Sequence, residues 1–250
     1  MTSSRTLRIG AAALLAFTGA CSSDSTGLGA PPTSLDQIFS EASLSSISAI
    51  NGGLAPVPVS TFAMPAPSSC SFSAGAFVCP TVTIGELQFS RKFTLYDENG
   101  VVQSQFVSGT TSRIKFESIA HGVVTSGTTG FTIDQSHDLL VSGLTSSTHV
   151  LNGTSRTTIT SVAPAGSTTA PATTTLAFVF NNLELPKGQN AYPGGGNIEL
   201  TATSSNLPGV PFHMQLAFNG TSKVAVTSDA GGIPFPPCSL DLAVANPTCR

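Results

Sequence analysis

The feature that most constrains the fold of this chain is a two-residue alternation of apolar and polar side chains, running from Phe77 toward the C-terminus. Segment 113–117, Arg-Ile-Lys-Phe-Glu, alternates strictly between charged and apolar residues. Successive side chains of a strand point to opposite faces, so this segment predicts a strand with one wet and one buried face. The dipeptide Asn-Gly, a strong hairpin signal, recurs between such runs at Asn99, Asn152 and Asn219.

The parity of the apolar residues predicts the length of two of these turns. A two-residue turn at Asn99-Gly100 pairs Phe93 with Phe106 on one face. At Gly220 a three-residue loop is predicted, with that glycine in the left-handed region. Only this length places the apolar residues of the two flanking strands on the same face. The β-rich runs number roughly ten to twelve and have hairpin-length connections. We therefore expect an all-β fold, a long antiparallel meander curled into an open barrel or a sandwich.

One N-terminal amphipathic helix is expected before the strands, over about residues 34–50. Ser34 and Gln37 have the spacing of a capping box, which marks a helix start. Asn51-Gly52 follows at the other end, where a C-terminal cap belongs. The apolar residues of the segment fall at helical spacing and form one stripe: Leu35, Ile38, Phe39 and Ala42. The helix is therefore expected to pack one face against an apolar surface.

The start of the chain follows the pattern of an export signal. Arg5 and Arg8 make a basic beginning, and an apolar stretch over 9–17 follows them. That stretch is far shorter than the roughly 20 residues that span a bilayer. It leads into Thr18-Gly19-Ala20-Cys21, and the whole segment resembles a bacterial lipoprotein signal peptide. The alternative is an ordinary secretory signal cut nearby, which would leave Cys21 an unpaired thiol.

The resemblance implies that Cys21 is the lipidation site and that its acyl chains anchor the protein in a membrane. Ser22 rather than Asp follows it, which by the same resemblance implies the outer membrane in a cell that has two. The expected organisation is a signal peptide over 1–20, a lipidated N-terminus and flexible tether over 21–33, and one β-rich domain over 34–250.

Four cysteines remain after Cys21, and an even number in an exported chain predicts disulfides. Their spacing favours two local loops, Cys70–Cys79 and Cys238–Cys249, each closing about ten residues. The rival pairing is a clasp that joins Cys70 to Cys249. Neither local pair has the two-to-four-residue spacing of zinc ligands, so we expect no metal site.

Composition limits the partners that this chain can have. Charged residues make up 9% of it, against about 25% in a typical soluble protein. The formal net charge is −3, and removal of Arg5 and Arg8 with the signal peptide makes the mature chain more acidic. An acidic, sparsely charged surface argues against nucleic acid as a partner.

No catalytic constellation emerges from the sequence. The densest polar cluster is segment 134–138, Asp-Gln-Ser-His-Asp, which holds a serine, a histidine and two carboxylates. Neighbouring residues of an extended chain point in opposite directions, so these side chains cannot form a relay among themselves. We expect a polar turn there, no catalytic residue and no cofactor. A hydrolase whose site joins distant strands stays an alternative.

The expected function is that of a non-enzymatic cell-envelope lipoprotein with a binding or structural role toward a lipid, a glycan or an envelope protein. The alternative is a carrier of lipid or another apolar ligand, with the helix over the sheet, an architecture similar to the LolA and LolB lipoprotein carriers. Five residues are candidates for its apolar ligand face: Phe178, Phe180, Phe212, Met214 and Phe218. Alternatively, these five residues fill a closed core and contact no ligand. A long unpaired edge strand would favour the structural role by strand addition.

Overall fold

The computed structural model describes residues 70–126, 129–162, 171–186 and 192–243. Within these ranges the chain is all-β and forms one antiparallel sheet, which confirms the predicted class. The helix predicted over 34–50, the signal peptide and the tether lie outside the described residues.

The sheet contains fourteen strands. Four consecutive strands near its middle, β6 to β9, are 14 or 15 residues long, against about 5–6 in a typical protein. In chain order the strands are β1 (Ser71–Ser73), β2 (Ala76–Val78), β3 (Val82–Ile84), β4 (Leu87–Tyr96), β5 (Val102–Gln103), β6 (Arg113–Ser126), β7 (Thr129–Ser142), β8 (Thr148–Val162), β9 (Thr173–Pro186), β10 (Asn197–Ser204), β11 (Phe212–Ala217), β12 (Lys223–Ala230), β13 (Ile233–Pro234) and β14 (Cys238–Asp241).

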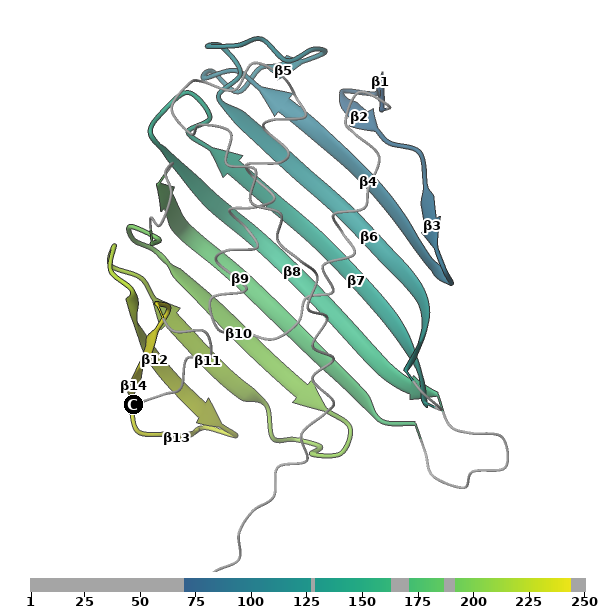
Figure 1. The fold of residues 1–250 in the computed structure, drawn as a ribbon, viewed down its shortest axis with the longest axis vertical. Coiled ribbons are helices and arrows are strands. Elements are labelled where there is room, and N and C mark those ends of the chain that lie inside the picture. The colour runs from purple at the N-terminus through teal and green to yellow at the C-terminus, as the bar shows by residue number, and fades with distance from the viewer. Residues whose placement is uncertain (1–69, 127–128, 163–170, 187–191, 244–250) are drawn as a thin grey trace, which may run out of the picture.

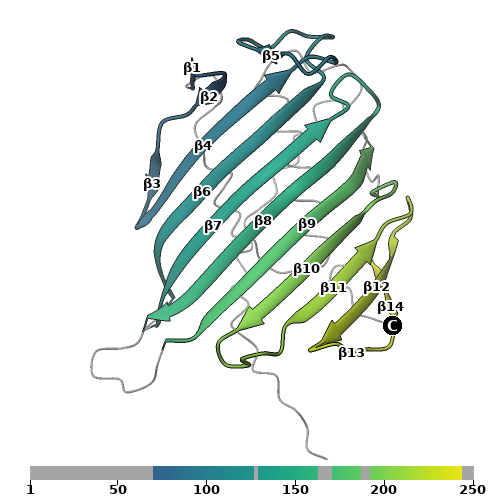
Figure 2. The same cartoon turned by 180° about the vertical axis from the view of Figure 1, so that it is seen from behind.

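The strands lie nearly in the order of the chain, as a meander requires. From β6 to β12 each strand pairs with the next, while β2, β3 and β5 pair with β4 at one edge and β13 and β14 pair with β12 at the other. Figures 1 and 2 show the N-terminal and C-terminal strands at opposite edges of one broad sheet. Within the described residues the sheet is not closed. The sequence left an open barrel and a sandwich as alternatives. The described strands form one open sheet.

One face of this sheet is apolar and buried. Directly paired residues share a face, and one row of pairs crosses eight strands through Phe93, Phe116, Leu139, Gly153, Phe180, Ile198, Leu216 and Val226. We call the side that carries this row the apolar face and the other side the polar face. On the polar face the Lys115 ammonium lies 3.1 Å from the Asp138 carboxylate and 3.7 Å from that of Glu117. The alternation predicted for segment 113–117 is confirmed, because Ile114 between the charges is buried.

At the first Asn-Gly site, the predicted two-residue turn is wrong. Tyr96 pairs with Val102, which leaves five residues in the loop. Strand β5 ends at Gln103, so on that side of β4 Phe93 pairs with Phe77 of β2 and not with Phe106. The Asp97 carboxylate accepts a hydrogen bond of 2.8 Å from a backbone N–H inside the loop, which stabilises the wider turn.

At the third Asn-Gly site the loop is also longer than the predicted three residues. Strand β11 ends at Ala217 and β12 begins at Lys223. The side-chain oxygen of Asn219 accepts a hydrogen bond of 3.2 Å from the backbone N–H of Thr221, so the wider loop has its own local bond. Gly220 has a φ of +81°, which confirms the predicted left-handed glycine.

The second Asn-Gly site is not a turn. Asn152 lies in the interior of β8, which pairs with β7 on one side and β9 on the other. Leu151 pairs with Leu183, whereas Gly153 pairs with Phe180, so two residues of β9 stand opposite one of β8. The dipeptide therefore lies opposite a β-bulge whose two residues, Asn181 and Asn182, belong to β9.

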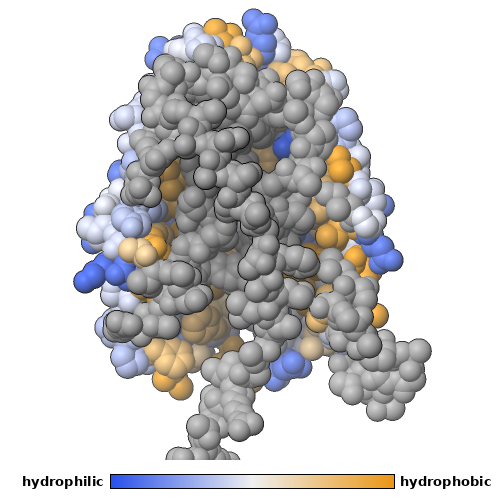
Figure 3. Space-filling view, viewed as in Figure 1, coloured by the Kyte–Doolittle hydropathy of each residue, from blue (hydrophilic) through white to orange (hydrophobic). Residues whose placement is uncertain are grey.

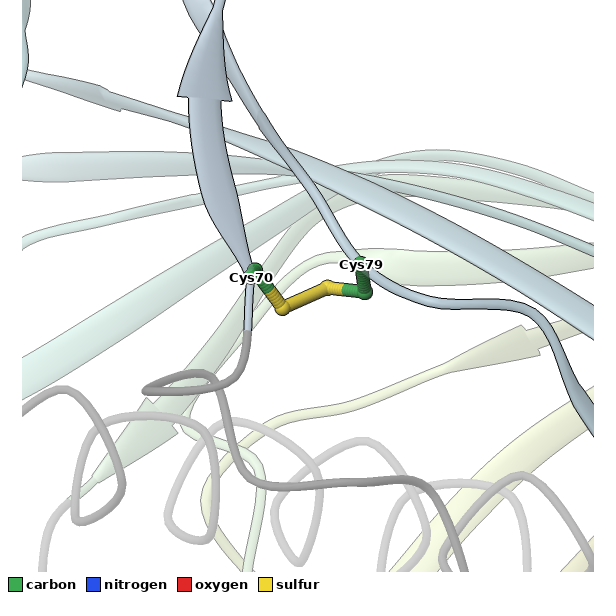
Figure 4. Close-up of a disulfide and its surroundings, with 2 residues drawn as sticks. All are labelled: Cys70 and Cys79. Atoms are coloured by element: carbon green, nitrogen blue, oxygen red, sulfur yellow. A yellow bond between two sulfur atoms is a disulfide. The ribbon is translucent and has the colours of Figure 1, made fainter.

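The predicted local disulfide Cys70–Cys79 is confirmed. It joins the residue before β1 to the residue after β2, with a Cα–Cα distance of 4.0 Å (Figure 4). Next to it the ring of Phe77 stacks on that of Phe93, with centroids 4.6 Å apart, which ties the β1–β2 hairpin to β4. Cys249 lies outside the described residues, so the pair Cys238–Cys249 stays a prediction.

Some apolar residues are exposed at one end of the sheet, in the connection β10–β11 and in β13, which follows the connection β12–β13. Leu207 is 61% exposed and Ile233 is 72% exposed. Figure 3 shows hydrophobic surface near β13 in this region. The two connections touch, because the backbone N–H of Gly231 donates to the carbonyl of Pro211 at 2.8 Å. Isolated exposed apolar side chains are ordinary on protein surfaces, and these serve below as control positions.

Candidate functional site

The five residues predicted to form an apolar ligand face lie together in the structure. Phe178 and Met214 belong to one register line through β10, and Phe180 lies on the neighbouring line. Phe178, Phe180 and Phe218 are buried in the core, and Met214 packs against that core partly buried. Phe212 stands on the same side of β11 as Met214. The fold thus gathers all five on the apolar face.

The polar turn predicted over 134–138 is wrong, because this segment lies inside β7. Pairing with β6 and β8 on both sides holds the segment extended in spite of its polarity. Gln135 and His137 point to the apolar face, and Asp134, Ser136 and Asp138 point to the polar face. The cluster therefore divides between the two faces and forms no relay of its own, as the sequence predicted.

A row of polar residues crosses the apolar face at the level of His137. Arg91 of β4 pairs with Ser118 of β6, Ser118 pairs with His137 of β7, and His137 pairs with Ser155 of β8. Neighbouring strands are about 4.8 Å apart, so the row is about 14 Å long. We call these four residues the polar row.

Three members of the polar row carry buried polar atoms that lack a partner within the part of the chain that the structure describes. Ser118 and Ser155 are 4% and 2% exposed. Their Oγ atoms and the Nε2 atom of His137 accept and donate no hydrogen bond there. Each such atom costs about 1–3 kcal/mol when it is left unpaired. Because native proteins satisfy most buried polar groups, three on consecutive strands mark a place where an additional polar group is expected.

The neighbouring register line provides a contrast. Gln135 and Thr157 are also polar, buried and on the apolar face. They satisfy one another, because the Gln135 side-chain amide donates to the Thr157 hydroxyl at 3.2 Å. Polar residues can therefore be buried on this face and still form hydrogen bonds. The polar row differs because three of its buried polar atoms have no partner among the described residues.

The polar row contains two ionisable side chains, Arg91 and His137, and both are buried. Burial lowers the pKa of His137 to about 4, so its imidazole is neutral at pH 7. Burial also lowers the pKa of Arg91, yet an arginine keeps its charge in proteins. Among the described strands, no Asp or Glu shares the apolar face. The described part of that face near the polar row thus has one formal positive charge and no negative one.

Beyond Ser155 the same register line becomes apolar. It continues through Phe178 on β9, Leu200 on β10 and Met214 on β11. A cavity of about 410 Å³ lies at the level of the polar row between β2 and β7. Polar-face residues make up most of its lining, among them Ser90, Lys92 and Glu117, and Arg91, Ser118 and His137 also border it. The line is therefore amphipathic, with hydrogen-bonding groups at one end and an apolar surface at the other.

The polar row lacks two requirements of a serine hydrolase within the described residues. No hydrogen bond joins either serine to His137, and no carboxylate lies on that face to orient the imidazole. On the polar face, His121 contacts Asp134, and both side chains are exposed. The described residues also contain no group of three His, Cys, Asp or Glu side chains that could hold a metal ion. The hydrolase alternative gains no support from this geometry.

No protein-family model, curated protein or solved structure matches this chain. Within the described ranges, no helix has the length and the apolar character needed to cross a membrane. The candidate site therefore rests on geometry.

The sequence contains a weak signal for each member of the polar row, but not for the row itself. Arg91 stands between Phe89 and Phe93 at the parity of the apolar residues, and His137 stands two residues before Leu139. Such a break in an alternating strand marks a polar side chain that points inward. Alignment of the four residues depends on the register of four strands, which the sequence alone did not provide.

Proposed function

We propose that this chain is a non-enzymatic cell-envelope lipoprotein that binds an apolar ligand on the apolar face of its sheet. The observation that carries the proposal is the continuous apolar row from Phe93 to Val226 across an open sheet. A sheet with one apolar face needs a second layer to cover it. All substantial contacts among the described strands are between strands paired in the sheet, so no described strand supplies that layer. The proposal places an apolar ligand within it.

The candidate ligand residues have the chemistry that this role requires. Phe178 and Phe180 contribute aromatic rings to the buried apolar face, and the unbranched thioether of Met214 adapts to ligands of irregular shape. An aliphatic chain on this surface would contribute roughly 25 cal/mol for each Å² of apolar area removed from water. The hydrophobic effect is therefore the proposed driving force for binding.

The edges of the sheet favour ligand binding over a structural role by strand addition. In the described ranges the edge strands are short: β1 and β3 have three residues each, β5 and β13 have two, and β14 has four. Short edge strands protect a sheet from pairing with another chain. The long unpaired edge that would support strand addition is not present among these strands.

The proposed location follows from the N-terminal resemblance. Acyl chains on Cys21 are the proposed membrane anchor, and Ser22 directs the protein to the outer membrane in a cell that has two. Cys21→Ala is expected to move the protein out of the membrane fraction and to abolish incorporation of labelled palmitate. A variant that stays in the membrane fraction and keeps the label would contradict the anchor.

Native mass spectrometry of the full chain, freed of detergent and incubated with a lipid extract, tests the binding proposal. We expect an adduct of lipid mass that organic solvent removes. Met214→Gln, on the apolar face, is expected to lower the fraction of protein with the adduct. Ile233→Gln is the matched control, because Ile233 is 72% exposed in the short edge strand β13. A bare mass for the wild-type chain after incubation would overturn the proposed function.

A further inference from the structure

We propose that residues 34–50 of this chain cover the apolar face of the sheet in the ligand-free protein, with the stripe of Leu35, Ile38, Phe39 and Ala42 against it. The inference goes beyond the proposed function, because this contact of the chain with itself holds whether or not a ligand binds. Its consequence is a competition, since ligand and segment would occupy the same surface, and that consequence rests on the proposed function.

The first argument is the burial of the apolar face. Phe93, Phe180 and Ile198, in β4, β9 and β10, are 0%, 1% and 1% exposed. Side chains stand roughly perpendicular to a sheet, so their ends stay open to solvent unless a second layer packs on them. The described strands make their substantial contacts only with strands paired to them, and Figures 1 and 2 show the described loops at the ends and edges of the sheet. Because the structure contains one chain, we assign the second layer to residues outside the described ranges.

The second argument is length. The undescribed ranges after β1 are short, and the longest of them is 163–170. A helix over 34–50 would be about 26 Å long, at about 1.5 Å per residue. Neighbouring strands are about 4.8 Å apart, so such a helix spans about five strand spacings. Residues 51–69 reach up to about 60 Å when extended. That reach is enough to place the helix over the middle of the sheet from Cys70, which precedes β1 at one edge.

The third argument is the match of the two surfaces. An amphipathic helix packs its apolar stripe against a core, and the row from Phe93 to Val226 is an apolar surface of the required kind. Segment and sheet belong to one chain, so the effective concentration of one for the other is on the order of millimolar. A second copy of the chain would have to overcome this local advantage. The observations therefore favour the chain's own segment as the occupant of the face.

The burial also limits how a ligand can bind. Side chains buried to this extent present no surface to a lipid until the atoms above them move. A ligand on the apolar face therefore competes with residues 34–50, and its measured affinity is lower than the affinity of an uncovered face.

Photo-cross-linking of the full chain, freed of detergent, tests the contact. The photoreactive residue p-benzoylphenylalanine replaces Phe39 in one variant and Leu35 in a second, so that either variant suffices if the other does not fold. Ser48 is the matched control position, because a rotation of about 100° per residue places it on the side of the helix opposite Phe39. We expect intramolecular cross-links, located by mass spectrometry, from positions 35 and 39 to residues of the apolar face such as Leu200 or Met214. From position 48 we expect none to that face. Stripe positions that link only to the polar face or to a second molecule, or that link no better than position 48, would overturn the cover.

Addition of the lipid extract separates this inference from the proposed function. Native mass spectrometry measures the lipid adduct, and the yield of the cross-link from position 39 is measured in the same sample. We expect that yield to fall by at least about threefold when the adduct forms. An adduct with an unchanged yield would overturn the competition and leave the cover in place. No adduct would overturn the proposed function and the competition with it, whereas the cross-link in the ligand-free chain would still decide the cover.

Discussion

The side-chain oxygen of Asn152 accepts a hydrogen bond of 2.8 Å from the backbone N–H of Asn182, across the bulge between β8 and β9. Asn182 has a φ of +47°, a conformation that costs most residues free energy and that asparagine tolerates best. Because of the extra residue in β9, the side chains that point to the apolar face have even numbers up to Phe180 and odd numbers from Leu183. Both residues therefore lie on the apolar face. The side chain of Asn152 thus stabilises the bulge that keeps the apolar residues of β9 on the apolar face.

Replacement of Asn152 tests this contact. Asn152→Ala removes the acceptor and is expected to lower the free energy of unfolding by about 1 kcal/mol, measured by urea denaturation. Asn182→Gly is the comparison, because glycine adopts a positive φ without a steric cost and keeps its N–H. It is expected to change the stability by less than about 0.5 kcal/mol. Equal losses for the two variants would show that the hydrogen bond has no role of its own.

The bulge has a signal in the sequence that is independent of Asn-Gly. Apolar residues occupy even positions at Leu176, Phe178 and Phe180, then odd positions at Leu183 and Leu185. A strand without a bulge cannot keep both sets on one face. The dipeptide at Asn152 suggested a hairpin because Asn-Gly is a frequent sequence of two-residue turns. Pairing of β8 on both sides, which decides between a hairpin and a strand interior, involves residues distant in sequence.

Gly153 should tolerate no side chain. Its φ is +127°, and a Cβ placed there would lie 2.1 Å from the carbonyl oxygen of Asp138. Gly153→Ala is therefore expected to lower the stability by at least about 3 kcal/mol or to prevent folding, because backbone atoms of β7 must move. Gly75→Ala is the control, since Gly75 has a φ of +81° but no atom within 4 Å of the added carbon. Backbone strain alone should cost it about 1–2 kcal/mol. Similar losses for both in urea denaturation would contradict the steric argument.

The disulfide Cys70–Cys79 is expected to stabilise the edge of the sheet. It closes a loop with a sequence separation of 9 residues. Chain-entropy arguments give such a loop roughly 2–3 kcal/mol of stabilisation. The double variant Cys70→Ala with Cys79→Ala should show this loss in thermal denaturation without reductant. Mutation is preferred to reduction because a reductant would also act on any disulfide at Cys238. An unchanged melting temperature would mean that the β1–β2 hairpin is held by other contacts, such as Phe77 on Phe93.

The features that the sequence predicted correctly depend on local pattern. The two-residue period predicted strands with one apolar face, and short cysteine spacing predicted Cys70–Cys79. The polar row could not be predicted in the same way, because it depends on the offset between paired strands. At the first loop the predicted register was already wrong by one residue, since Tyr96 and not Asp97 pairs with Val102. Errors of that kind accumulate across four strands, so Arg91 and Ser155 could not be aligned from the sequence.

His137 is expected to make the stability depend on pH. Burial lowers its pKa from the usual 6.5 to about 4 in the folded chain. Between these values the unfolded chain binds a proton that the folded chain does not. Stability is therefore complete above about pH 6.5 and falls, by up to about 3 kcal/mol, as the pH drops toward 4. His137→Gln should remove this part of the pH dependence in urea denaturation series. His213→Gln is the control, because His213 is exposed beside Thr201, and it should keep the wild-type slope. Identical slopes for wild type and His137→Gln would contradict the prediction.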